Sequence, residues 1–322
     1  MITYRNRLHL IAGLGGAALF GTRAEAAANY PRRPIELIVP YAAGGGTDLV
    51  ARAFAESAKP HLERAIGVVN RPGGGGAVGL SEIMAARPDG YKIGLGTVEL
   101  TMLPHMGLVR FKSDDFVPVA RLNAEPSAIT VKTDAPWQTL QQFLDYAKAN
   151  SGKLRVGNSG TGAIWHLATE ALGDKIGTKF NAIPYDGAAP AVTALLGGHI
   201  EAVAVSPAEV SAQVQAGQLR ILGVMADERL ADFPDVPTFK ESGTDVAIGT
   251  WRGIFVQKRV PQDVVDILRT AARATANEQS FKDTLKKLNL NWAYLDGPEF
   301  APQVEQQNAF FGELMKRVGL AR

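Results

Sequence analysis

The chain has 322 residues and carries 34 Lys and Arg residues against 32 Asp and Glu residues, but three of the basic residues and one acidic residue fall within positions 1–26. The remainder therefore carries no net charge, and it lacks the electrostatic footprint of a protein that binds nucleic acids or anionic membranes. The sequence contains no cysteine, which excludes disulfides, thiolate metal sites, a cysteine nucleophile and a lipid-modified cysteine.

The N-terminus has the pattern of a secretory signal peptide. Arg5 and Arg7 form a basic start, residues 8–20 are apolar or small apart from His9, and "AEAAANYP" offers a cleavage site after Ala26. The apolar run is shorter than the ~20 residues of a membrane span. We therefore predict that residues 1–26 are a cleaved leader and that the mature chain is exported without membrane insertion. The alternatives are an uncleaved anchor and a buried N-terminal helix. Export without cysteine favours a bacterial periplasm.

After the leader, short apolar runs alternate with segments of helical period. Eight runs are predicted as strands, at residues 35–39, 67–69, 92–96, 128–131, 154–157, 200–205, 221–225 and 253–256. The clearest helix begins after a capping box of Thr139 and Gln142, and another, "APAVTALLGG", ends on glycines. This alternation predicts an α/β fold with mostly parallel sheet.

One structural motif recurs in both halves of the chain: an apolar strand, then a glycine-rich turn, then the start of a helix. It occurs in "IVPYAAGGGTDLVAR", in "RVGNSGTGAIWHLATEAL" and, more loosely, in "IPYDGAAPAVTALL". Glycine lets a ligand approach the backbone, and a helix start presents unpaired N–H groups and positive partial charge. Such turns predict anion sites that need no basic side chain. The alternative is that they merely connect elements.

Motifs for catalysis, metals and cofactors are incomplete. "GNSGT" resembles a nucleophile elbow but has Thr161 in place of the final glycine, and its dinucleotide-loop spacing is also wrong. The five histidines show no close ligand pair. We therefore predict no catalytic residue, no metal site and no cofactor.

An ordered set of motifs resembles a known family. "YPRRPIELIVPYAAGGGTDLVAR", "VVNRPGGGGAVG", "ARPDGYKIGLGT", "VGNSGTGAIWHLA", "IPYDGAAPAVTALLGGHIEA" and "LGVMADERLADFPDVPTFKESG" resemble the Bug-type extracytoplasmic receptors of the tripartite tricarboxylate transporters. The resemblance runs from about Tyr30 to the C-terminus. It implies a fold similar to type II periplasmic binding proteins, with two α/β lobes, a ligand cleft between them and two hinge crossings. Lobe 1 would be residues 27–125 plus 246–322, and lobe 2 residues 126–245.

The resemblance also implies the ligand-binding residues. In the first turn they are Tyr41, Gly44, Gly45, Thr47 and Asp48, where waters bridge to the ligand in similar proteins. We expect Asp48 mainly to cap the helix start and fix the turn, and not to recognise the charge of the ligand. The second turn supplies direct carboxylate donors at Ser159, Gly160, Thr161 and Gly162, with His166 on the helix that follows, and the third turn supplies Tyr185, Asp186, Gly187 and Ala188. From its position beside the second turn we add Trp165 as a candidate for the cleft wall, the alternative being a core residue. From the segment after the strand at 92–96 we add Thr97 and Glu99.

Some charged positions depart from the family pattern. Asp186 stands where a basic or other polar residue is common, and Glu99 stands where small hydroxyl residues are common. If Glu99 points inward, the ligand would carry an amino group or another donor besides a carboxylate. The alternative is that Glu99 is solvated or pairs with a basic neighbour such as Arg110. Arg252 is a further charge near the second crossing.

The sequence thus predicts a periplasmic protein that captures a small organic acid for uptake. The resemblance implies delivery to a permease of two membrane proteins. One alternative is a sensory protein that presents its ligand to a signalling partner, and another is an exported hydrolase on a similar scaffold. The pattern does not specify which acid binds.

Overall fold

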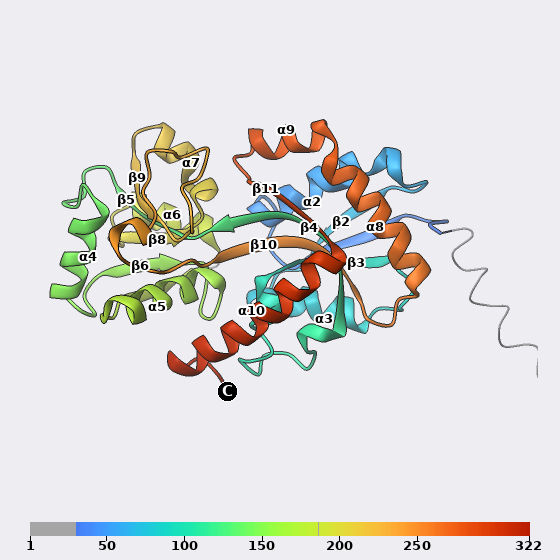
Figure 1. Ribbon diagram of the computed structural model, residues 1–322, viewed down its shortest axis with the longest axis horizontal. Coiled ribbons are helices and arrows are strands. Elements are labelled where there is room, and N and C mark those ends of the chain that lie inside the picture. Colours follow the sequence, from blue (N-terminus) through green and yellow to red (C-terminus); the bar gives the residue numbers. More distant parts are fainter. Residues whose placement is uncertain (1–29, 186) are drawn as a thin grey trace, which may run out of the picture.

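The computed structural model describes residues 30–185 and 187–322, so the predicted leader and Asp186 lie outside the described residues. Two α/β lobes lie side by side, and strands β4 and β10 run between them across the middle of the molecule (Figure 1). Each lobe is built on one sheet. The two-lobed α/β architecture predicted from the sequence is therefore confirmed, while the predicted lobe bounds stay a prediction.

The first sheet contains the N-terminal and C-terminal strands. In spatial order its six strands are β11 (Trp292–Asp296), β4 (Phe116–Pro126), β10 (Gly249–Gln257), β3 (Lys92–Thr97), β1 (Ile35–Val39) and β2 (Ile66–Asn70). The second sheet, from the middle of the chain, has five strands in the order β7 (Asn181–Pro184), β6 (Arg155–Asn158), β8 (Ala202–Val205), β5 (Ala128–Lys132) and β9 (Leu219–Val224).

The prediction of a mostly parallel sheet is wrong, because both sheets are mixed. β1 is parallel to β2 and β3, and β6 is parallel to β7 and β8. The strands that follow each crossing run the other way: β10 is antiparallel to β3 and β4, and β5 is antiparallel to β8 and β9. β5 and β10 each enter a lobe from the hinge. They therefore run in the opposite direction to the strands that are connected by helices within that lobe.

Helices cover both sheets, and two of them, α4 and α6, have the terminal residues predicted from the sequence. Those of the first lobe are α2 (Gly46–Ser57), α3 (Ala77–Ala85), α8 (Gln262–Asn277), α9 (Gln279–Lys287) and α10 (Gly297–Arg317), and those of the second are α4 (Leu140–Ala149), α5 (Ile164–Ile176), α6 (Ala188–Leu196) and α7 (Pro207–Gln215). The capping box before α4 is present, and α6 ends at Gly197. Among the described residues, no helix combines the length and the apolar character that crossing a membrane requires.

The two crossings are joined to each other by backbone hydrogen bonds. Ser127, between β4 and β5, donates its N–H to the carbonyl of Ile248 at 2.8 Å, and Met225 donates to the carbonyl of Ser127 at 2.8 Å. Ile248 in turn donates to Met225 at 3.0 Å. The hinge is therefore a short connection of three hydrogen-bonded chain segments, in which the residue after β9 lies beside both crossings.

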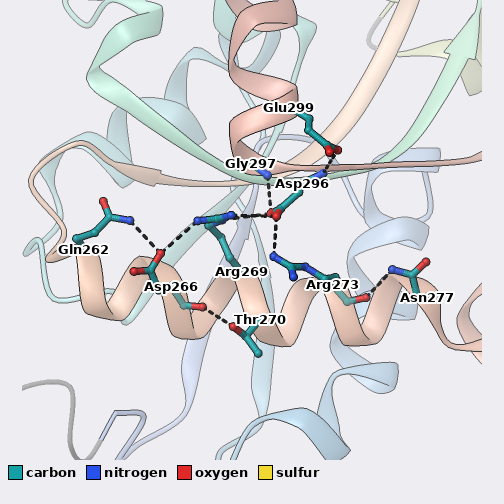
Figure 2. Close-up of polar contacts among 9 residues, drawn as sticks. All are labelled: Gln262, Asp266, Arg269, Thr270, Arg273, Asn277, Asp296, Gly297 and Glu299. Atoms are coloured by element: carbon teal, nitrogen blue, oxygen red, sulfur yellow. Dashed lines mark hydrogen bonds and ion pairs between the residues drawn. The ribbon is translucent and has the colours of Figure 1, made fainter.

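A carboxylate holds the start of α10 in the first lobe (Figure 2). Asp296 caps this helix by accepting from the N–H of Gly297 at 2.8 Å. It also accepts from Arg269 at 2.9 Å and from Arg273 at 2.7 Å, which lie one turn apart on α8. The hydrogen bonds from Arg269 lower the pKa of Asp296, so the carboxylate stays charged and ties α8 to α10.

The apolar core continues from one lobe into the other. One cluster of buried side chains includes Phe255, Phe300 and Phe311 of the first lobe together with Val156 and Leu167 of the second. α10 runs diagonally from the first lobe toward the second, where Arg317 pairs with Asp174 of α5 at 3.5 Å (Figure 1). The lobes are therefore packed against each other in this structure.

The hinge leaves no room for a side chain at Gly249. A Cβ there would overlap the carbonyl oxygen of Glu125 and lie 2.7 Å from the Cα of Pro126, both of which are backbone atoms. We expect Gly249→Ala to lower the free energy of unfolding by about 1–3 kcal/mol, because the crossings must move apart. Urea denaturation measures this. Gly67→Ala is the control, since its nearest atom is 3.9 Å away, and equal stability of the two variants would contradict the prediction.

Candidate functional site

The turn after β1 is held by a buried carboxylate. Asp48 is only 2% exposed, and its Oδ2 accepts from the N–H of Gly44 at 2.9 Å and from Arg52 at 2.9 Å. Its Oδ1 accepts from Asn70 at 3.0 Å. Gly44 has φ of +85°, a conformation that favours glycine. Asp48 therefore fixes the turn, and it occupies one amide that the glycine run could have offered to an anion. The expectation that it also caps the helix start is wrong, because its bond goes to Gly44, before the N-cap Gly45, and α2 has no side-chain cap.

Arg252 lies buried against the start of α2. Its guanidinium donates to Thr47 Oγ1 at 3.1 Å and to Asn123 Oδ1 at 2.7 Å. A Cβ at Gly46 would lie 2.8 Å from its Nη2, so the glycine makes this approach possible. A full positive charge thus accompanies the positive end of the helix at this turn.

Two acidic side chains lie within electrostatic reach of Arg252, the buried Glu125 and the half-buried Glu209. Glu125 of β4 accepts from Asn123 Nδ2 at 2.9 Å and from the N–H of Asn291 at 2.6 Å. Burial raises the pKa of Glu125 to about 7, although the charge of Arg252 opposes this. Burial also raises the pKa of Glu209 on α7, again opposed by Arg252. Arg252 therefore interacts electrostatically with acidic groups of both lobes.

Glu99 joins the two lobes directly. Tyr41 and Thr97 form a hydrogen bond at 2.8 Å between their hydroxyls, and Thr97 Oγ1 donates to Glu99 Oε2 at 2.6 Å. Glu99 Oε1 accepts from the N–H of Ile164, the first residue of α5, at 3.1 Å. The side chain is only 4% exposed. A carboxylate of the first lobe thus occupies an amide at the positive end of a second-lobe helix.

This geometry decides between the two interpretations of Glu99. The side chain points into the lobe boundary, so the interpretation that it is solvated or paired with Arg110 is wrong. Glu99 is buried, whereas Arg110 is exposed. The physical reason is that Thr97 and the start of α5 supply donors that compensate its burial.

Part of the loop between β6 and α5 is already satisfied internally. The N–H of Gly160 donates to Asn158 Oδ1 at 3.0 Å, and the N–H of Gly162 donates to His166 Nδ1 at 2.9 Å. Ser159 is half-buried and Thr161 is exposed, and within the described ranges no hydrogen bond to either hydroxyl is seen. These two residues are therefore the ones in this loop with donors left for a ligand.

The other predicted residues belong to the second lobe. Trp165 is buried in α5, directly after Ile164. Tyr185 and Ala188 are half-buried, and the N–H of Tyr185 donates to the carbonyl of Asn158 at 3.1 Å, so the third turn begins beside the second. Gly187 precedes the first residue of α6, and Asp186 lies outside the described residues.

Sequence reasoning missed several residues of the boundary. Asn123 and Glu125 alternate along β4, and polar side chains at every second position of a buried strand were a readable signal. Met106 had no such signal. It packs on Gly162, where a Cβ would overlap the Met106 side chain.

The geometry does not support nucleophilic catalysis at Ser159. A serine nucleophile needs a hydrogen bond to a base, but His166 Nδ1 accepts from the N–H of Gly162 instead. In the parts of the chain that the structure describes, no three His, Asp or Glu side chains gather as candidate metal ligands.

Comparison with known proteins identifies the family. The family described as "Tripartite tricarboxylate transporter family receptor", TctC, matches residues 50–320. A TctC solute-binding protein from Polaromonas is 48% identical over 89% of this chain and 99% of its own, with a TM-score of 0.74. The periplasmic binding protein BugD is 31% identical over 91% of this chain and 99% of its own, with a TM-score of 0.82.

A third solved structure contains a bound acid. Rpa4515 of R. palustris with adipate is 25% identical over 91% of this chain and 99% of its own, with a TM-score of 0.84. The chain belongs to the family of tripartite tricarboxylate transporter receptors, as its motifs predicted. It is therefore a solute-binding protein of a transport family and not an enzyme, which removes the hydrolase alternative.

The raised pKa of Glu125 predicts how stability depends on pH. Folded Glu125 keeps its proton up to about pH 7, whereas the unfolded chain releases it near the ordinary value of 4.5. Because the unfolded state then binds fewer protons, the free energy of unfolding falls as pH rises from about 4.5 to 7. We expect Glu125→Gln to flatten this fall, since an amide oxygen still accepts from Asn123 and Asn291 without titrating.

Urea denaturation at a series of pH values between 4.5 and 8 measures the effect. Glu63→Gln is the matched control, because Glu63 is exposed and should leave the pH profile of the wild-type chain unchanged. Parallel profiles for Glu125→Gln and the wild-type chain would show that this carboxyl does not titrate in the window.

Proposed function

We propose that the chain captures a small organic acid between its lobes and delivers it to a membrane permease for uptake. The observation that carries this proposal is the placement of the glycine-rich turns. The turns after β1 and β6 both face the lobe boundary, where Glu99 joins one to the start of the helix behind the other. Family membership and the adipate complex of the R. palustris relative support an organic acid as ligand.

The ligand carboxylate would bind at the second-lobe loop. Ser159 and Thr161 offer hydroxyls there, next to the start of α5, and the N-terminus of α6 follows the neighbouring strand β7. Hydroxyl and amide donors at such turns suit a carboxylate, because they stabilise its charge without a buried cation. The first-lobe turn, with Tyr41 and Thr47, would close over the ligand.

The cellular role follows from the same family. Periplasmic relatives such as BugD and the predicted leader support a periplasmic location for this chain. Closure of the lobes around a ligand gives a surface that a permease of two membrane proteins can distinguish from the open form. The hinge connection at Ser127 and Ile248 is where the chain would absorb that motion.

A thermal-shift screen of residues 27–322 tests the binding function. The screen covers aliphatic mono- and dicarboxylates, aromatic acids, and acidic and amidated amino acids. A ligand that binds only the folded chain stabilises it by ~2.7 kcal/mol at 100 times its dissociation constant, which raises the melting temperature. No shift with any acid would contradict the proposal.

The loop hydroxyls predict which substitution weakens binding. Because a hydrogen bond to a charged group contributes ~1.5–3 kcal/mol, we expect Thr161→Val to lower the affinity for the acid found in the screen about tenfold or more. Isothermal titration calorimetry measures the change. Thr270→Val is the matched control, since Thr270 lies exposed on α8 of the first lobe (Figure 2). Equal affinities of the two variants would place the carboxylate elsewhere.

A further inference from the structure

The hydroxyls next to Glu99 have a fixed direction of hydrogen bonding. Thr97 has one hydroxyl proton, and it is donated to Glu99. The hydrogen bond between Tyr41 and Thr97 must then be donated by Tyr41. Burial raises the pKa of Tyr41 and the charge of Glu99 raises it further, so the phenol keeps the proton that this arrangement needs.

This direction leaves no donor on the two hydroxyls. Tyr41 donates to Thr97 and Thr97 donates to Glu99, so only lone pairs remain on these two oxygens and on the carboxylate. A carboxylate of a ligand cannot donate to these oxygens and is repelled by them. A protonated amino group has three donors and satisfies them.

The helix behind the second-lobe loop is also partly occupied. The N–H of Ile164 at the start of α5 is bonded to Glu99. A second ligand carboxylate would therefore have to displace Glu99 from this amide, which would leave a buried carboxylate without its partner. A carboxylate of the chain thus already occupies the first amide of α5.

Glu99 accepts hydrogen bonds from neutral donors. Its partners are the hydroxyl of Thr97 and the N–H of Ile164, and among the described residues it forms no ion pair with a basic side chain. The buried Arg252 donates to Thr47 and Asn123 instead. A further carboxylate beside Glu99 would thus meet a like charge that no ion pair offsets.

We propose that Glu99 sets the charge class of the ligand: the site takes an acid with one carboxylate and a protonated amino group, and it rejects a dicarboxylate of the same length. The inference rests on the proposed function, because it places the ligand carboxylate at Ser159 and Thr161 and the amino group against Glu99, Thr97 and Tyr41. Glu99 is thereby a specificity-determining residue as well as a contact between the lobes.

Matched pairs of probes test this proposal on residues 27–322. Each pair has the same carbon skeleton between its ends: succinate with 3-aminopropanoate, glutarate with 4-aminobutanoate, adipate with 5-aminopentanoate, and 4-(carboxymethyl)benzoate with 4-(aminomethyl)benzoate. Calorimetric titration gives the affinity of each probe. In the wild-type chain we expect the amino member of the best-bound pair to bind about tenfold tighter or more, as a neighbouring opposite charge requires.

Glu99→Gln should reverse this preference. Without the charge of Glu99, we expect the amino member of the pair to bind more weakly and the dicarboxylate to bind more tightly. The ratio of the two affinities then changes by about a hundredfold. Thr97→Val provides a second variant that keeps the Glu99 charge but frees the Tyr41 proton, and it should narrow the ratio without reversing it. The control Glu63→Gln should keep the ratio of the wild-type chain.

The outcomes separate this inference from the proposed function. Two outcomes would overturn the role of Glu99 and leave acid capture unaffected. In the first, dicarboxylates bind and no amino-bearing probe binds. In the second, the ratio of the two affinities is the same in the wild-type chain, Glu99→Gln and Thr97→Val. A chain that binds no acid in the wider screen would overturn acid capture itself, and the inference with it. A ratio that moves as described supports both.

Discussion

The buried polar network at the two chain crossings is the constraint on which the rest of the structure depends. Arg252 on β10 and Glu125 on β4 are held there by Asn123, Thr47 and the backbone of Asn291. A charge buried as far from water as that of Arg252 is stable only if its partners stay in place. The network therefore fixes how β4 and β10 leave the first lobe, and this sets where the second lobe meets the turn after β1.

Much of the fold was readable because its signals are local. The apolar runs, the capping box at Thr139 and the glycines after α6 each report on a few neighbouring residues, and the corresponding elements formed. Strand direction was not readable in this way. β10 lies antiparallel to β3 because the chain re-enters the first lobe through the hinge, a fact that no short window of sequence contains.

The site shows the same division between local and distant information. The turn around Asp48 was predicted because its partners Gly44 and Arg52 lie four residues away. The position of Glu99 was left open because its partner Ile164 is 65 residues further along the chain and in the other lobe. Tertiary packing alone decides whether such a carboxylate is solvated or buried.

Trp165 lies beside the hydrogen bond between Glu99 and Ile164, and this position affects the intrinsic fluorescence of the chain. Trp165 directly follows Ile164, whose amide Glu99 binds, and its indole is buried. Trp251, on the crossing strand β10, packs edge-on against Phe300 with ring centroids 4.8 Å apart. An indole's emission depends on the polarity of its surroundings, so a separation of the lobes would change the intrinsic fluorescence of the chain. The protein thus carries its own reporter of opening and closing at the boundary, without any attached dye.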